Sequence, residues 1–127
     1  MILVDTSVWI DHLRSPDAKL QALLQNDQIM THPFVRLELA LGSLAGREKV
    51  LADLALLPQA PVVATEELFS LIDFRKLYRR GLGLTDLHLI RCAIFDESIR
   101  SGPKTGDWVK LQTSLGFVHR YLKICSK

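Results

Sequence analysis

The feature that most constrains the fold is a short apolar run that ends on an acidic residue. Ile2, Leu3 and Val4 are followed at once by Asp5. Three apolar residues are too few for a core helix, but they suit a buried strand. We therefore expect a buried strand here, with a carboxylate at its carboxyl end.

Further strands and helices are expected to alternate along the chain. A second strand is predicted at residues 29–31 and a last one from residue 117, while residues 62–63 fit either a strand or an extended lead-in. Apolar spacing and capping residues predict helices over residues 7–14, 16–25, 33–44, 47–57, 65–80, 86–99 and 108–115. This order predicts an α/β fold with a small, mainly parallel sheet flanked by helices. In such sheets ligands bind beyond the carboxyl ends of the strands, where Asp5 is placed.

Length and composition narrow the class of protein. The 127 residues fit a single domain over 1–127, and a hydrophobic content of 48% is sufficient for a core. The sequence has neither a run of about 20 apolar residues nor a secretory signal, so we expect a cytoplasmic protein without a membrane segment. Cys92 and Cys125 do not form a disulfide framework, and no Cys/His pair has zinc-ligand spacing.

The net charge of +2 is too small to indicate a nucleic-acid partner by itself. One group of basic residues stands out, at Arg75, Lys76, Arg79 and Arg80. It fits a solvated helix end or a nucleic-acid contact, and charge patterning does not decide between them.

Two further carboxylates are placed unusually for surface charges. Glu38 shares a predicted helix face with Phe34 and Leu41, which we expect to be the core face. Asp86 begins a helix whose following turns are apolar. Buried carboxylates are costly, and several directed at one place also repel each other. A divalent cation would remove both costs, and oxygen ligands favour Mg²⁺ or Mn²⁺. Such a site suits phosphodiester hydrolysis.

Each acid also has a purely structural interpretation. Asp5 could cap the helix that follows it, and Asp86 could be favoured by the dipole of its own helix N-terminus. Glu38 could pair with a buried arginine.

Four motifs give the chain a resemblance to a known family. Residues 4–11 (VDTSVWID) resemble the opening of PIN-domain proteins, specifically the VapC toxins of bacterial toxin–antitoxin pairs. Residues 33–42, with PFV and ELALG, are similar to the second acidic motif, and residues 81–90 (GLGLTDLHLI) to the third. Residues 105–107 (TGD), followed by Leu111, resemble the fourth.

The resemblance implies a PIN-like fold and a metal-dependent endoribonuclease that acts on RNA, often tRNA or rRNA. It implies an acidic site of Asp5, Glu38, Asp86 and Asp107, with Asp5 and Asp86 as ligands of Mg²⁺ or Mn²⁺. Thr6 would orient Asp5 through its hydroxyl. The expected partners are a cognate VapB-like antitoxin and a second copy of the chain, as a homodimer.

Three alternatives stay open at this point. The stretch before Asp107 is polar and contains Gly102-Pro103 where the family has an apolar strand, which fits a catalytically weak PIN-fold module that binds RNA or protein. A phosphatase with an aspartyl nucleophile would need a second acid where Ser7 stands. Metal-free RNA cleavage would need paired histidines, and the sequence does not bring two of its four together; His88 is expected at the surface or a boundary.

Overall fold

The sheet at the centre of the molecule is small and parallel. The computed structural model describes residues 2–95 of the chain. In it β1 (Ile2–Leu3) pairs with β2 (Ile29–Met30), with Ile2 opposite Ile29 and Leu3 opposite Met30. An isolated parallel bridge also joins Thr31, the residue after β2, to Gln59. The predicted α/β class with a small parallel sheet is confirmed.

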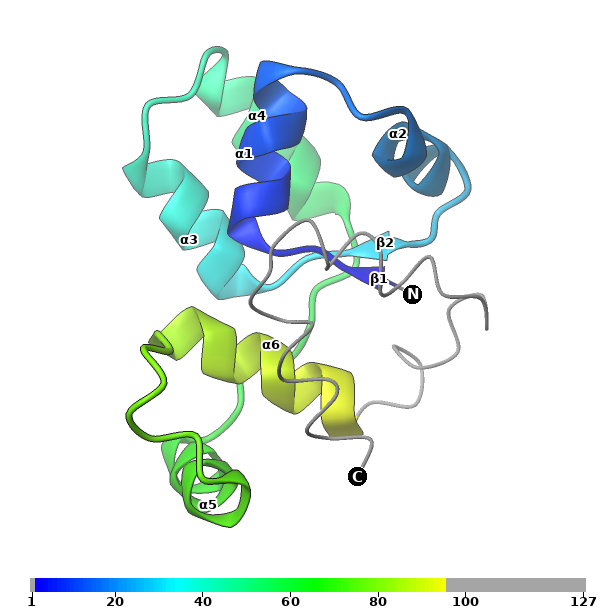
Figure 1. The fold of residues 1–127 in the computed structure, drawn as a ribbon. Helices are drawn as coiled ribbons and strands as arrows, with labels where there is room; N and C mark the ends of the chain where they lie inside the picture. Colours follow the sequence, from blue (N-terminus) through cyan, green and yellow to red (C-terminus); the bar gives the residue numbers. More distant parts are fainter. Residues whose placement is uncertain (1, 96–127) are drawn as a thin grey trace.

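Helices lie on both sides of this sheet (Figure 1). On one side are the first four helices, and on the other side the last two. Their bounds are α1 (Thr6–Arg14), α2 (Ala18–Gln25), α3 (Pro33–Leu41), α4 (Arg47–Leu56), α5 (Thr65–Arg75) and α6 (Leu84–Phe95).

The two faces of β1 explain this layering. Successive side chains of a strand point to opposite faces. Ile2 and Val4 accordingly join the core under α1–α4, whereas Leu3 joins Met30, Ala60 and Cys92 on the side of α6. Because both faces are buried, the strand reads as an unbroken apolar run. Cys92 is a core residue.

The first core also contains Trp9, which is buried beside Leu20, Val35, Leu39 and Leu54. Trp9 is therefore a packing residue and not a platform for stacking on RNA bases. A third apolar cluster joins α5 to α6, since Leu71 and Leu77 pack with Ile90 and Ile94. Ile90 and Ile94 are four residues apart and lie on one face of the helix.

Several predicted boundaries differ from the observed ones. The helix predicted over residues 65–80 ends at Arg75, because Lys76 adopts a left-handed conformation with φ of 52°. The helix predicted over 33–44 ends at Leu41, and the one predicted from Pro16 begins at Ala18, after an Asp17 cap that accepts a hydrogen bond from the Leu20 N–H. Residues 62–63 form the extended lead-in and no strand. The elements predicted over 108–115 and from residue 117 lie outside the described residues.

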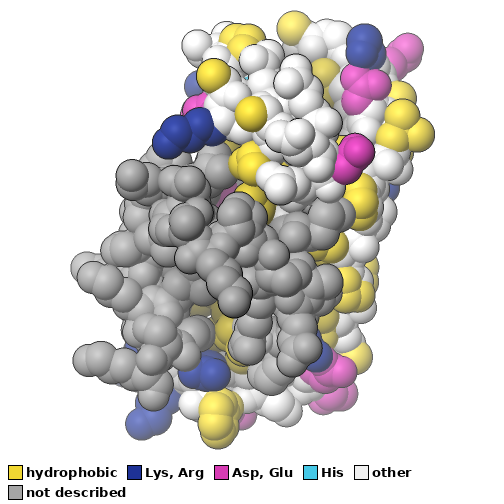
Figure 2. All heavy atoms as spheres, turned by 90° about the vertical axis from the view of Figure 1, so that its right-hand side faces the viewer, with side chains coloured by type: hydrophobic (Ala, Val, Ile, Leu, Met, Phe, Trp, Pro, Cys, Tyr) yellow, Lys and Arg dark blue, Asp and Glu magenta, His cyan; other side chains and the backbone are white. Residues whose placement is uncertain are grey.

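No helix in the described range is long and apolar enough to cross a membrane. Figure 2 shows one face of the molecule, on which described basic and acidic side chains are scattered singly or in small groups among apolar ones.

A pair of leucines on α3 tests this packing. We expect Leu39→Ala to lower the free energy of unfolding by about 2–5 kcal/mol, because the 1% exposed side chain would leave a cavity. Leu41→Ala, on the same helix but 88% exposed, should change it by less than about 0.5 kcal/mol. Urea unfolding of both variants gives the comparison, and equal losses would contradict the assigned core face of α3.

Candidate active site

Asp5 connects β1 to α1. It precedes the first helical residue with an extended backbone, and its side chain makes no capping hydrogen bond to that helix. Instead the Ser7 hydroxyl donates to Asp5 Oδ2 at 2.8 Å. The interpretation of Asp5 as a side-chain cap is therefore wrong. Its carboxylate is half-buried and held from one side by the first turn of α1.

Glu38 lies on α3, but not on the face that the sequence suggests. Val35 and Leu39 form the buried face of α3, while Glu38 is exposed and Leu41 points to solvent. The prediction that Glu38 shares a core face with Phe34 and Leu41 is wrong, because the buried residues Val35 and Leu39 each come one residue later, about 100° further round the helix.

A hydroxyl from α1 holds Glu38 in place. The Thr6 hydroxyl donates to Glu38 Oε2 at 2.5 Å, which links the first turn of α1 to α3. Thr6 was expected to orient Asp5, and this assignment is corrected, since Ser7 contacts Asp5 and Thr6 contacts Glu38. The adjacent hydroxyls thus each position one acid.

Asp86 lies in the first turn of α6. Its Oδ2 accepts a hydrogen bond of 2.9 Å from the backbone N–H of Gly83, the residue before the helix. This is the reciprocal half of a capping box, so the structural interpretation of Asp86 as a favoured helix N-terminal residue holds. Asp86 has a second interaction besides this cap, because it also interacts electrostatically with Asp5 and Glu38.

The three acids interact electrostatically. The pKa of Asp86 is raised, first by burial and then by the negative charges of Asp5 and Glu38, against the opposing effect of the Gly83 hydrogen bond. The ion pairs among the described residues are Lys49–Asp53 and Arg91–Glu67, so none of the three acids is neutralised by a cation there. An arginine partner for Glu38 is thus not found in that part of the chain.

The acids do not close into a finished metal site as they stand. Within residues 2–95, no three His, Cys, Asp or Glu side chains are close enough together to hold a metal ion. The chemistry of the donors nevertheless fits a hard divalent cation, since they are oxygen ligands whose negative charges are not paired with a cation in the described part of the chain. Asp107, the fourth predicted acid, lies outside the described residues.

Comparisons with known proteins identify the family. The family model for the PIN domain matches residues 2–99. The chain belongs to the PIN-domain family. It is also 53% identical over 90 residues to Ribonuclease VapC32 of Mycobacterium tuberculosis, in strains CDC 1551 and H37Rv, over 71% of this chain and 73% of the relative. No solved structure matches the chain significantly. The predicted resemblance to VapC-type PIN-domain ribonucleases is confirmed.

This PIN domain brings two histidines together, which the sequence did not reveal. The rings of His32 and His88 lie 4.9 Å apart between centroids, and Phe34 packs edge-on against both. Both are fully buried, so the expectation of a surface or boundary position for His88 is wrong. Contacts between helices that are distant in sequence create this cluster, and no local pattern signals it.

Burial keeps both histidines neutral, and backbone groups satisfy their ring nitrogens. His32 Nδ1 accepts from the Phe34 N–H at 3.0 Å, and Nε2 lies 3.2 Å from the Pro61 carbonyl, to which it donates. His88 Nδ1 accepts from the Val63 N–H at 3.3 Å. Burial lowers the pKa of His88, and burial together with the nearby His88 lowers that of His32 to about 4. The pair therefore joins α3 to α6 and does not fit acid–base catalysis on RNA.

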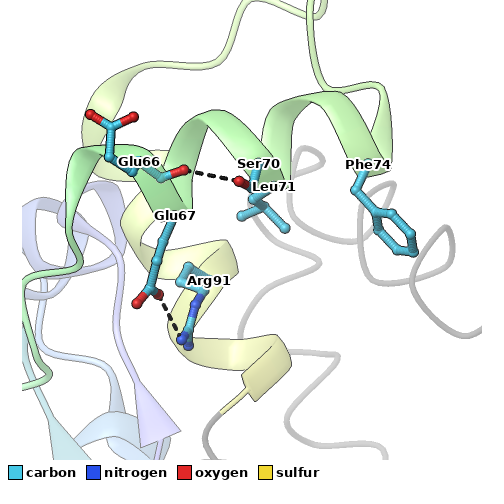
Figure 3. Close-up of a pocket in the computed structure, with 6 residues that line it drawn as sticks. All are labelled: Glu66, Glu67, Ser70, Leu71, Phe74 and Arg91. Carbon is cyan, nitrogen blue, oxygen red and sulfur yellow. Dashed lines mark hydrogen bonds and ion pairs between the residues drawn. The ribbon is translucent and has the colours of Figure 1, made fainter.

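A separate depression lies between α5 and α6 (Figure 3). Its volume is about 560 Å³, and it is lined by Glu66, Glu67, Ser70, Leu71, Phe74 and Arg91. The acid nearest the centre of this view, Glu67, is paired with Arg91 at 2.9 Å. The carboxylate of Glu67 is therefore neutralised by Arg91, whereas Asp5, Glu38 and Asp86 have no ion-pair partner among the described residues.

The neutral histidines give a pH dependence that can be measured. A histidine whose pKa is lowered by folding stabilises the protein fully above its unfolded value of 6.5, and this stabilisation is lost as pH falls towards about 4. Between pH 7 and 5 we expect His32 to account for a loss of about 2 kcal/mol. His32→Asn keeps an acceptor for the Phe34 N–H and should lose correspondingly less over that interval. Urea unfolding at both pH values tests this, and equal losses in parent and variant would refute it.

Proposed function

We propose that this chain is the toxin endoribonuclease of a type II toxin–antitoxin pair and hydrolyses RNA phosphodiesters at an acidic site that binds Mg²⁺ or Mn²⁺. The site consists of Asp5, Glu38, Asp86 and Asp107, with Asp5 and Asp86 as the metal ligands. The observation that carries the proposal is the raised pKa of Asp86, to which Asp5 and Glu38 contribute from two other elements. Its support from relatives is the similarity to a protein named as a ribonuclease.

The neighbours of the acids suit this role. Among the described residues, each carboxylate accepts a hydrogen bond on one oxygen: Ser7 contacts Asp5 Oδ2, Thr6 contacts Glu38 Oε2 and Gly83 contacts Asp86 Oδ2. These donors fix the carboxylates and leave the second oxygen of each available to a cation. When bound, the cation would supply an activated water and stabilise charge on the phosphodiester.

The charge balance also indicates that a bound cation would strengthen RNA binding at the acids. Three neighbouring carboxylates repel a polyanionic substrate as well as each other. The exposed position of Glu38 and the half-buried positions of Asp5 and Asp86 place the cluster where an RNA strand can approach from solvent.

The proposal extends to location and partners. It places the protein in the cytoplasm, with tRNA or rRNA as substrate, a VapB-like antitoxin as inhibitor and a homodimer as the assembly. The helix α4 packs Val50, Leu51 and Leu54 into the core and exposes Leu56. The exposed apolar residues of α3, Leu37 and Leu41, offer a better contact surface. Co-purification with the product of a small neighbouring gene tests the antitoxin, and light scattering tests the dimer.

A second candidate is a PIN-fold module that binds RNA or protein and cuts weakly. The incomplete convergence of the three acids within the described residues favours it. An assay of RNA cleavage with Mg²⁺ or Mn²⁺ distinguishes the two functions, because only the endoribonuclease should cleave efficiently.

We expect Asp5→Asn and Asp86→Asn each to lower RNA cleavage in Mg²⁺ or Mn²⁺ by at least about 100-fold, as loss of a metal ligand does. Asparagine keeps an acceptor for Ser7 or Gly83 but removes the charge. Mn²⁺ should raise the melting temperature of the parent and not of these variants. Asp53→Asn is the matched control, because Asp53 is exposed and paired with Lys49 on α4.

In EDTA the Asp86→Asn variant should be at least as stable as the parent, since it lacks the charge whose burial and repulsion by Asp5 and Glu38 raise the pKa of Asp86. Loss of activity without loss of stability then assigns the effect to the site. Asp107→Asn, treated in the same way, tests the fourth acid. Cleavage that persists in excess EDTA would overturn the metal mechanism, and a parent that binds RNA without cleaving it would favour the binding module.

A further inference from the structure

The segment between α5 and α6 carries a compact set of cations that the acidic site does not use. Residues 76–80, here called the basic loop, contain Lys76, Arg79 and Arg80 around Leu77 and Tyr78. No Asp or Glu occurs from residue 74 to residue 85. Lys76 caps the end of α5, while Arg79 and Arg80 lie beyond the helix and form no part of its face.

The loop is anchored and held in a specific conformation. Leu77 is buried against Ile90 and Ile94 of α6. Lys76 and Arg79 both have positive φ, of 52° and 61°, in a region that side chains with a Cβ rarely adopt. The guanidinium Nε of Arg80 donates to the Lys76 carbonyl at 3.1 Å and braces the turn. Such strain persists where surrounding structure enforces it, and it concentrates at functional segments.

The anchoring turns the other side chains outward. Lys76 and Arg79 are exposed, and neither forms an ion pair with another residue in the described range. Tyr78 lies between them in sequence and is 55% exposed. Two free cations beside an exposed aromatic ring are the elements with which proteins hold single-stranded nucleic acid.

The loop is also close to the acids. It runs through residues 81–83 to the N-terminal end of α6 (Figure 1), where the Gly83 N–H contacts Asp86. Gly83 is the fifth residue after Tyr78, so the chain cannot place the two more than about 18 Å apart. A strand bound at the acidic site can therefore reach the loop within a few nucleotides.

We propose that the basic loop binds the single-stranded part of the RNA substrate beside the cleavage site, with Lys76 and Arg79 on phosphates and Tyr78 stacked on a base. This inference rests on the proposed ribonuclease function. The acidic side chains of the site repel the phosphates of RNA, and the nearby cations of the basic loop would offset this repulsion. Stacking on Tyr78 adds affinity without demanding a particular base.

The test measures RNA binding separately from cleavage. The full chain, in EDTA so that the probe stays intact, is titrated into a fluorescein-labelled single-stranded RNA dodecamer at several salt concentrations. Lys76→Asn and Arg79→Asn should weaken binding and each reduce the salt slope by about 0.7. Asparagine is chosen because it tolerates positive φ.

Tyr78→Ala should weaken binding roughly 5- to 150-fold without altering the salt slope, and Tyr78→Phe should retain parent affinity because the ring is kept. Stacking on Tyr78 should quench the fluorescence of 2-aminopurine placed in the dodecamer. Among the variants, Tyr78→Ala alone should lack this quenching. The matched controls are Lys19→Gln, an exposed cation on α2, and Phe69→Ala, an aromatic residue on α5 that is 59% exposed. Both should bind as the parent does, and circular dichroism melts verify folding.

The two proposals fail in different ways. If the loop variants and the parent bind the dodecamer equally, or the parent does not bind it, the loop proposal is overturned even when the parent cleaves RNA; a protein partner then becomes the explanation for the exposed cations. If binding depends on the loop as described but no cleavage occurs with Mg²⁺ or Mn²⁺, the loop proposal stands and the ribonuclease proposal falls.

Discussion

The parallel pairing of β1 with β2, buried on both faces, is the constraint on which the remaining structure depends. Two residue pairs fix its register, and the alternation of side chains sends Ile2 and Val4 to one core and Leu3 to the other. A slip by one residue would exchange these faces and open both cores. The register therefore also fixes where Asp5 leaves the sheet, and with it the position of the first acid relative to α3 and α6.

From this anchor, three elements carry three negative charges toward one another. Burial and, after it, repulsion by Asp5 and Glu38 raise the pKa of Asp86, so the folded protein contains interactions that oppose its own stability. Local hydrogen bonds from Thr6, Ser7 and Gly83 offset part of the cost. The buried histidines join the start of α3 to α6. They therefore hold together the two helices that carry Glu38 and Asp86. Strain of this kind is typical of sites that bind a charged ligand.

The sequence predicted the features that depend on short-range patterns. The run before Asp5 gave the first strand, and capping chemistry gave the position of Asp86 at a helix start. It did not predict the exposed face of Glu38, because α3 has apolar residues on several sides and only packing against α1 and α4 selects Val35 and Leu39. The contact of Thr6 with Glu38 and the pairing of His32 with His88 were also missed, since both join segments that are distant in sequence.

The early end of α5 shows how a local deviation can carry functional meaning. Charge patterning alone left the basic residues near Arg75 as a solvated helix end or a nucleic-acid contact. The left-handed conformations of Lys76 and Arg79 break the helix, and the burial of Leu77 turns its neighbours toward solvent. An amphipathic helix end would instead have spread these charges around its axis. The fold thus places Lys76 and Arg79, which form no ion pair with another described residue, a short stretch of chain away from Asp86, which also lacks one there, and a polyanion that bridges them would satisfy both.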